Sequence, residues 1–272
     1  MTANPMRAAG STAHVEPAAW TRAARATGAV AAASLAALCL LVWQAAPDWS
    51  LSTGVRAPVT RNLLFFHPPA AWASFAAYAT VVVGSIAYLN ERDPRHDRLA
   101  RCAAEAGWVL NTVALTTGTF WGIQEWSDSG QSALATVYTE PKVLVVVVLW
   151  ATFGAYLLLR RLVPSATRAA RLGAAFALLG FLAVPASFVT SRVLTTSLHP
   201  DIGGPGANPD AAVEGSVGAL LAFGAFAFLA LFVHLLVLRL RLAHLEDKVA
   251  AAEDAAETRE DAGTAPRPEA KA

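Results

Sequence analysis

The stretch His67-Pro68-Pro69-Ala70-Ala71-Trp72 opens a segment of this chain in which residues 69–89 include no acidic or basic side chain. About 20 apolar residues are enough for a helix to cross a bilayer hydrocarbon core of about 30 Å. The two prolines fit the first turn of a helix, where a missing N–H costs nothing. We therefore expect a membrane-spanning helix that begins beside His67.

The composition of the whole chain agrees with this expectation. Of 272 residues, 55% are hydrophobic and 15% are charged, and the mean hydropathy is +0.44. Soluble globular proteins carry about 25% charged residues. The net charge of +1 and the lack of a basic run with interleaved aromatics give no sign of a nucleic-acid partner. Cys39 and Cys102 form no CxxC pair and do not identify a redox compartment.

Six apolar segments are long enough to span a membrane, so we predict an all-α, polytopic fold with six transmembrane helices. The segments are Ala26–Ala46, Pro69–Leu89, Cys102–Ile123, Val143–Val163, Leu172–Ser191 and Ser216–Leu240. They define a membrane domain over residues 26–240, with a flexible N-terminal tail over 1–25. A charged C-terminal tail covers 241–272; we expect it to begin as a helix that extends the sixth span and then to become disordered.

The arginines predict the orientation, because basic residues near span ends stay cytoplasmic. Twelve arginines lie before the first span, between the second and third, between the fourth and fifth, and after the sixth, against Arg56, Arg61, Lys142 and Arg192 in the other three loops. The inner set comprises Arg22, Arg25, Arg92, Arg95, Arg98, Arg101, Arg160, Arg161, Arg168, Arg171, together with Arg239 and Arg241 after the sixth span. We expect both termini in the cytoplasm.

With this orientation, His67 and His199 are the histidines of the outer loops, and each lies close to a span end. Heme iron takes two axial ligands and neutral imidazole is suitable, whereas zinc would need three or four ligands. The pair therefore favours a heme site in which both histidines bind the metal. The alternative is that each sits at the membrane interface and bonds a carbonyl or a lipid headgroup.

The second outer loop contributes aromatic residues. Trp121 and Trp126 end the third span, and the glycines beside Trp121 permit close approach of a flat ligand. The two indoles could form an apolar platform for a porphyrin, or they could be ordinary anchors in the interfacial aromatic belt.

These three outer segments together resemble the cytochrome c assembly family, the CcmC- and CcsA-like heme-handling membrane proteins. That family has six spans, a histidine in the first and third outer loops, and a Trp-rich "WWD" segment in the second. The segment 67–72 is similar to the family's His-Val-Pro-x-Ala-Trp, Ser197-Leu198-His199 to its Thr-Leu-His, and Thr117–Trp126 to the opening of the WWD segment. The resemblance covers roughly residues 26–240.

The chain departs from the family pattern in its aromatic residues. Residues 127–137 include no aromatic side chain. The family's Trp-Asp-x-Arg-x-Thr is matched by Thr139-Glu140-Pro141-Lys142-Val143-Leu144, which keeps the acid and the base but loses the tryptophan. Leu194 and Thr195 stand where the family has tryptophans before the third-loop histidine.

The resemblance implies that His67 and His199 hold the iron of heme b (iron protoporphyrin IX), with Trp72, Trp121 and Trp126 against the ring. It implies heme delivery at the extracytoplasmic face of the cell membrane for c-type cytochrome biogenesis, and no enzymatic step. A heme chaperone and ATP-binding cassette subunits would be the partners. Arg192, seven residues before His199, ranks first among the outer arginines as a partner for the propionates.

Two other classes of function stay open: a membrane heme-dependent redox enzyme, and a structural subunit of an assembly complex that no longer binds heme. The first would need histidines deep in facing helices, where only His234 lies; we expect it to be a satisfied core histidine. For Glu105 we expect a local pair with Arg101, and for Pro185 a kink in the fifth span.

Overall fold

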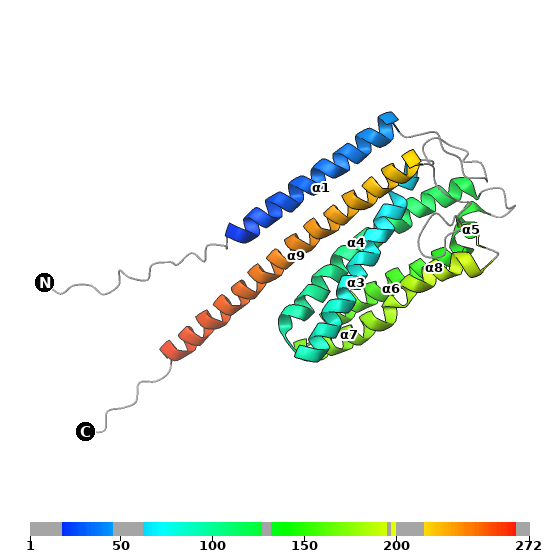
Figure 1. The fold of residues 1–272 in the computed structure, drawn as a ribbon. Helices are drawn as coiled ribbons and strands as arrows, with labels where there is room; N and C mark the ends of the chain where they lie inside the picture. Colours follow the sequence, from blue (N-terminus) through cyan, green and yellow to red (C-terminus); the bar gives the residue numbers. More distant parts are fainter. Residues whose placement is uncertain (1–17, 46–61, 127–131, 195–196, 200–214, 265–272) are drawn as a thin grey trace, which may run out of the picture.

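The computed structural model describes residues 18–45, 62–126, 132–194, 197–199 and 215–264 (Figure 1). Within these ranges the chain is helical, which confirms the predicted all-α class. The elements are α1 (Ala18–Ala45), the 3₁₀ turn η1 (Leu63–Phe65), α3 (His67–Glu91), α4 (Pro94–Glu125), α5 (Ala133–Thr139), α6 (Pro141–Leu162), α7 (Ala166–Phe181), α8 (Ala183–Val193) and α9 (Gly215–Thr264).

Five helical segments in the described ranges are long and apolar enough to cross a membrane, and they coincide with five of the predicted spans. They are Ala18–Gln44, Leu63–Glu91, Pro141–Leu162, Ala166–Val193 and Gly215–Thr258. The chain is therefore a multi-pass membrane protein. The predicted third span, 102–123, lies inside α4, which is not among the five, so the number six stays a prediction, as does the orientation.

The helix α4 is less apolar than the five other helical segments, and its polar side chains have partners inside the bundle. Asn111 is fully buried, and its amide donates to the hydroxyl of Tyr78 on α3 (3.4 Å). Glu105 forms an ion pair with Arg239 of α9. The expected local pair of Glu105 with Arg101 is wrong, because α9 packs against α4 and brings a guanidinium from another helix to this carboxylate.

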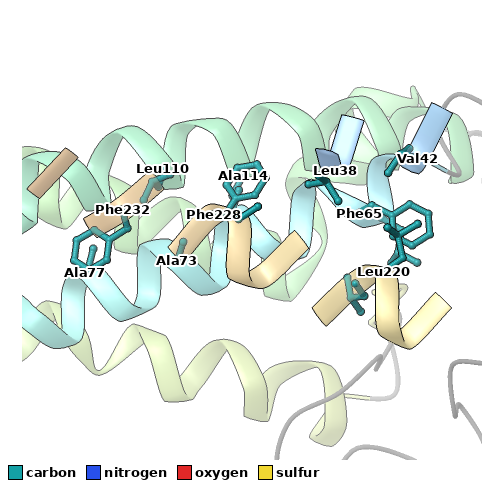
Figure 2. Close-up of a cluster of buried hydrophobic side chains, with 14 of the residues drawn as sticks. Leu38, Val42, Phe65, Ala73, Ala77, Leu110, Ala114, Leu220, Phe228 and Phe232 are labelled. Carbon is teal, nitrogen blue, oxygen red and sulfur yellow. The ribbon is translucent and has the colours of Figure 1, made fainter. Parts of the chain in front are cut away.

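Two hydrophobic cores share α3 and α4. The first joins α3 and α4 to α1, η1 and α9, and Figure 2 shows Leu38, Phe65, Leu110, Phe228 and Phe232 among its side chains. The second core joins α3 and α4 to α6, α7 and α8, and includes the stacked rings of Tyr78 and Phe153, whose centroids lie 3.7 Å apart. The pair α3–α4 is thus the central layer of the molecule.

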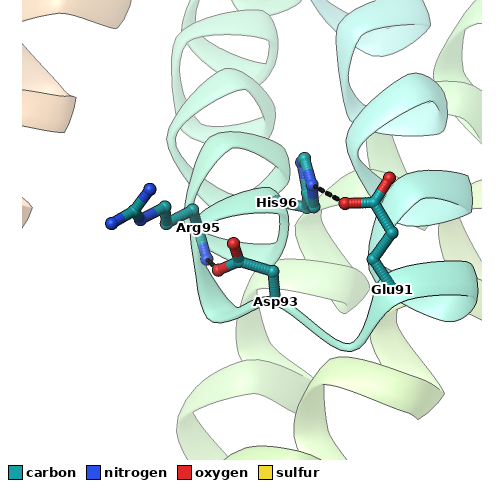
Figure 3. A network of polar contacts seen from close by, with 4 residues as sticks. All are labelled: Glu91, Asp93, Arg95 and His96. Atoms are coloured by element: carbon teal, nitrogen blue, oxygen red, sulfur yellow. Dashed lines mark hydrogen bonds and ion pairs between the residues drawn. The ribbon is translucent and has the colours of Figure 1, made fainter.

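A tight turn joins α3 to α4. Arg92 ends α3 in the left-handed conformation (φ 60°). Asp93 then caps α4 by accepting a hydrogen bond from the backbone N–H of Arg95 (2.8 Å), and Pro94 takes the first helical position. The imidazole of His96 lies 2.8 Å from the carboxylate of Glu91 across the turn (Figure 3). This histidine is partly exposed, and its contact with Glu91 links the two helices at the turn.

The helix α1 lies alongside α9 (Figure 1). Midway along the pair, Nδ1 of His234 lies 3.1 Å from the hydroxyl of Thr27. Gly28 leaves room for the imidazole, since a Cβ there would lie 2.9 Å from Cε1 of His234. His234 thus has a polar partner on α1, as a satisfied core histidine should.

The helix α9 extends well past the sixth predicted span. It continues to Thr264, so the helical part of the expected C-terminal tail is longer than its apolar spacing indicated. Arg98 of α4 forms an ion pair with Asp247 in this extension. The helix α1 begins at Ala18, so residues 18–25 of the expected flexible N-terminal tail are helical. Residues 1–17 and 265–272, the remaining parts of the two expected tails, lie outside the described residues, as do Arg56 and Arg61.

The predicted kink at Pro185 is confirmed as a break between two helices. Proline lacks an N–H and its ring crowds the carbonyl four residues earlier, and α7 ends at that residue, Phe181, with α8 starting at Ala183. After the break, α8 carries Phe188, which lines the cavity described below.

The close contact between α3 and α4 generates a stability prediction. A Cβ at Gly107 would lie 2.9 Å from Cβ of Ala77 and 2.9 Å from Cε1 of Tyr78. We expect Gly107→Val to force the helices apart and to destabilise the protein by about 1–3 kcal/mol, as overpacking does. Thermal unfolding in detergent measures the effect. Val109→Leu, at a half-exposed position on the same helix, is the control, and equal melting temperatures for the two variants would contradict the prediction.

Candidate functional site

A cavity that encloses about 880 Å³, counting the space open to solvent, is lined by residues where α3 begins, α4 ends, α6 begins and α8 ends. These helix ends lie together at one end of the molecule (Figure 1). The lining of the cavity is chiefly apolar and aromatic, with a few polar groups: His67, Trp72, Phe75, Leu115, Thr119, Trp121, Trp126, Lys142, Val143, Val146, Phe188 and His199 are among the lining residues.

His67 stands in the first turn of α3, where Pro68 and Pro69 follow it as the sequence predicted. Its Nδ1–H donates to the carbonyl oxygen of Ala114 on α4 (2.9 Å). A carbonyl can only accept, so Nδ1 carries the proton and, in the neutral ring, Nε2 keeps its lone pair. Metal-binding histidines in proteins usually have this kind of support from the second ring nitrogen.

Gly118 on α4 makes room for the His67 ring. A Cβ at this position would lie 2.6 Å from Cε1 and 3.0 Å from Nδ1 of His67, closer than non-bonded carbon atoms can approach. The sequence predicted that the glycines beside Trp121 admit a flat ligand. In the structure Gly118 accommodates the imidazole itself, and this packing fixes the ring in the orientation that Ala114 selects.

His199 faces His67 across the cavity. The centroids of the two imidazoles lie 6.2 Å apart and their planes are inclined by 46°. The two residues are separated by the whole of α3 to α8 in the sequence, yet the fold brings their rings together, as the prediction of a shared site requires.

The predicted aromatic residues gather around this pair. Trp121 is largely buried, and its ring centroid lies 6.3 Å from that of His199. Trp126 caps α4 and meets Trp121 edge to face at 5.4 Å. Trp72 lines the same cavity and also packs against the first hydrophobic core. All three side chains thus adjoin one space.

Of the two cations near the cavity, Lys142 is among its lining residues, whereas the sequence analysis ranked Arg192 first. Lys142, in the first turn of α6, lines the cavity, and its Nζ lies 5.9 Å from the ring centroid of Phe188. Arg192 lies over the same ring, also at 5.9 Å, and donates to the carbonyl of Phe188 (2.8 Å). Sequence reasoning ranked Arg192 first and passed over Lys142, although Lys142 occupies the basic position of the family's Trp-Asp-x-Arg motif.

The imidazoles of His67 and His199 are the potential metal-binding groups among the residues that line the cavity. In the described part of the chain, no group of three or more His, Cys, Asp or Glu residues is arranged to hold a metal ion. A zinc site would need such a group. His67 and His199 instead face each other as two imidazoles in an aromatic cavity.

Comparisons with known proteins agree with the motifs. Residues 13–199 match the family model described as Cytochrome C assembly protein. The chain is 29% identical over 185 residues to heme exporter protein C of Bradyrhizobium diazoefficiens, an alignment that covers 67% of this chain and 62% of that protein. It is 28% identical over 132 residues to heme exporter protein C of Paracoccus denitrificans, covering 46% and 52%. A putative ccmC-like mitochondrial protein of Marchantia polymorpha is 29% identical over 90 residues, covering 33% and 37%.

The packing of Gly118 on His67 can be tested without any ligand. We expect Gly118→Val to displace the imidazole and to break its hydrogen bond to Ala114. Nitrogen-15 NMR of histidine-labelled protein should show a protonated, hydrogen-bonded Nδ1 at His67 in the wild type and lose this signature in the variant. Gly215→Val is the control, because a Cβ at Gly215 meets no atom within 4 Å. An unchanged His67 signal in Gly118→Val would show that the ring is not held in this way.

Proposed function

Because this chain belongs to the cytochrome c assembly protein family, we propose that it binds heme in the cavity between α3, α4, α6 and α8 and hands it on for c-type cytochrome biogenesis. The chain spans about 62% of the Bradyrhizobium relative it matches. Heme is the cargo in this proposal. The protein supplies ligands, a shaped cavity and charges, and carries out no covalent chemistry.

The facing imidazoles are the observation on which the proposal depends. An iron bonded to two imidazole nitrogens at about 2 Å each places the ring centroids about 6 Å apart. The centroids of His67 and His199 are separated by 6.2 Å. The hydrogen bond from Nδ1 of His67 to Ala114 leaves Nε2 as the ligand atom. These distances support His67 and His199 as the axial pair.

The walls of the cavity suit the porphyrin. Trp72, Trp121 and Trp126 would contact its apolar faces and edges. Heme carries two propionates. Lys142 lines the same cavity, and Arg192 lies over the ring of Phe188, which Lys142 also contacts. We propose that Lys142 is the first partner of a propionate and that Arg192 supports it from beside Phe188.

The arginine distribution supports a position of the site at the extracytoplasmic face of the cell membrane. There the bound heme would be accessible to a heme chaperone, whereas the opposite end, with the α3–α4 turn and the extension of α9, would meet cytoplasmic ATP-binding cassette subunits. A structural subunit without heme is the competing function, and the following experiment separates the two.

Removal of either axial ligand should abolish six-coordinate heme. We expect purified wild type, supplied with heme, to show the absorption spectrum of low-spin, bis-imidazole heme. His67→Ala or His199→Ala should lose this spectrum and bind heme at least about 100-fold more weakly, beyond the 10–100-fold typical for groups that merely support a ligand. His96→Ala, at the α3–α4 turn, should bind as the wild type does. Wild type that takes up no heme would support the structural-subunit reading.

The proposed role of Lys142 has its own test. A charge-assisted hydrogen bond to a propionate is worth about 1.5–3 kcal/mol, or roughly 10–100-fold in affinity. We expect Lys142→Met to lose about that factor for heme but little for heme dimethyl ester, which has no free carboxylates. Lys248→Met, on the exposed extension of α9, is the matched control. An equal loss for heme and its ester would assign Lys142 a packing role instead.

A further inference from the structure

The carboxylate of Glu140 joins two segments that approach the cavity from different parts of the chain. Glu140 stands between α5 and α6 and is 3% exposed. Its Oε2 accepts a hydrogen bond from the backbone N–H of Val143 (2.9 Å), which caps the N-terminus of α6. Its Oε1 accepts a hydrogen bond from the hydroxyl of Ser197, 57 residues farther along the chain. Both carboxylate oxygens are therefore engaged, one by a helix and one by the segment after α8.

Ser197 is also hydrogen-bonded to His199, so it links Glu140 to this histidine. The backbone N–H of Ser197 donates to the carbonyl of Leu194 (3.0 Å), which ties it to the end of α8. Its hydroxyl oxygen accepts the backbone N–H of His199 (3.4 Å) while its hydroxyl proton points to Glu140. Two successive hydrogen bonds thus lead from a buried carboxylate to the backbone of a proposed axial ligand.

The two histidines are held by different means. His67 belongs to the first turn of a long helix, and its ring is bonded to Ala114 and packed on Gly118. His199 follows the end of α8 outside any helix, so its backbone needs fixation by side chains. Side-chain hydrogen bonds to ionised groups are among the stronger ones in proteins, and Glu140 with Ser197 provides such a bond at this place.

We propose that Glu140 and Ser197 form a latch that positions His199 as the second axial ligand, and that breaking the latch frees this ligand while His67 stays bound. The proposal rests on the proposed function, since it assumes that the cavity takes heme. Glu140 and Ser197 are positioning residues in this scheme; neither touches the iron.

The cleanest variant is Ser197→Ala, which removes the hydroxyl and leaves the cap of α6 in place. In heme-loaded full-length protein, we expect part of the heme to change from six-coordinate low-spin to five-coordinate high-spin, as seen by absorption and electron paramagnetic resonance. Added imidazole should restore the low-spin form by filling the vacated position. Transfer of heme to a scavenging apoprotein should be about tenfold faster, the factor expected for the loss of one hydrogen bond to a charged group.

Two further variants make the result specific. Ser197→Thr keeps the hydroxyl and should retain the wild-type spectrum and transfer rate. Ser165→Ala removes a serine that caps α7, where it accepts from the N–H of Arg168, and should also behave as the wild type. A wild-type spectrum and transfer rate in Ser197→Ala would overturn the latch.

A measurement without heme separates failure of the latch from failure of the proposed function. Thermal unfolding of the ligand-free Glu140→Gln and Ser197→Ala variants and of the double variant forms a double-mutant cycle. If the two groups interact as the structure has them, the double variant should lower the melting temperature by clearly less than the sum of the two single changes. Strictly additive shifts would contradict the latch even if wild-type protein takes up no heme.

Discussion

The close approach of α3 and α4 is the constraint on which the rest of the molecule depends. Small side chains line this contact, and at Gly107 there is no space for a further carbon atom beside Ala77 and Tyr78. In membranes, small residues allow helix backbones to approach and van der Waals packing to hold them. The same approach brings the Ala114 carbonyl and Gly118 of one helix against the His67 imidazole of the other. The helix pair therefore supports the fold and also orients the imidazole of His67.

The helices on the two sides of α3 and α4 have different roles. The cavity is lined by residues of α3, α4, α6 and α8 and by the ends of neighbouring segments. The pair α1–α9 contacts the opposite side of α3 and α4 and contributes to a separate core. The cavity borders both cores, since Trp72 packs against the first and Phe188 against the second.

The sequence was most informative where one residue type repeats over a long segment. Apolar runs predicted five of the observed membrane helices, two prolines predicted where α3 begins, and Pro185 predicted the break in the fifth span. The sequence was least informative where a partner comes from another helix. Glu105 has Arg101 one turn away, but its actual partner is Arg239 on α9, and no local spacing indicates this.

In the candidate site, too, some features follow from local sequence and others depend on the tertiary fold. The histidine pair and the tryptophans follow from motifs, and the fold brings them to one cavity. The Ala114 carbonyl that selects the tautomer of His67 is backbone, so its residue type carries no signal. The link from Glu140 to Ser197 was equally hidden, because both residues are common polar types in loops and only the tertiary fold places them together.

The spacing of the two histidines in the sequence determines when both imidazoles are present during synthesis. His199 follows His67 by 199 − 67 = 132 residues, and at a synthesis rate of 5–20 residues per second the second imidazole is made about 7–26 s after the first. During this interval, the nascent chain has one of the two imidazoles and an incomplete wall of the cavity. The two rings can therefore face each other only after α8 has been made, and α9 is added to a chain that already has every residue lining the cavity.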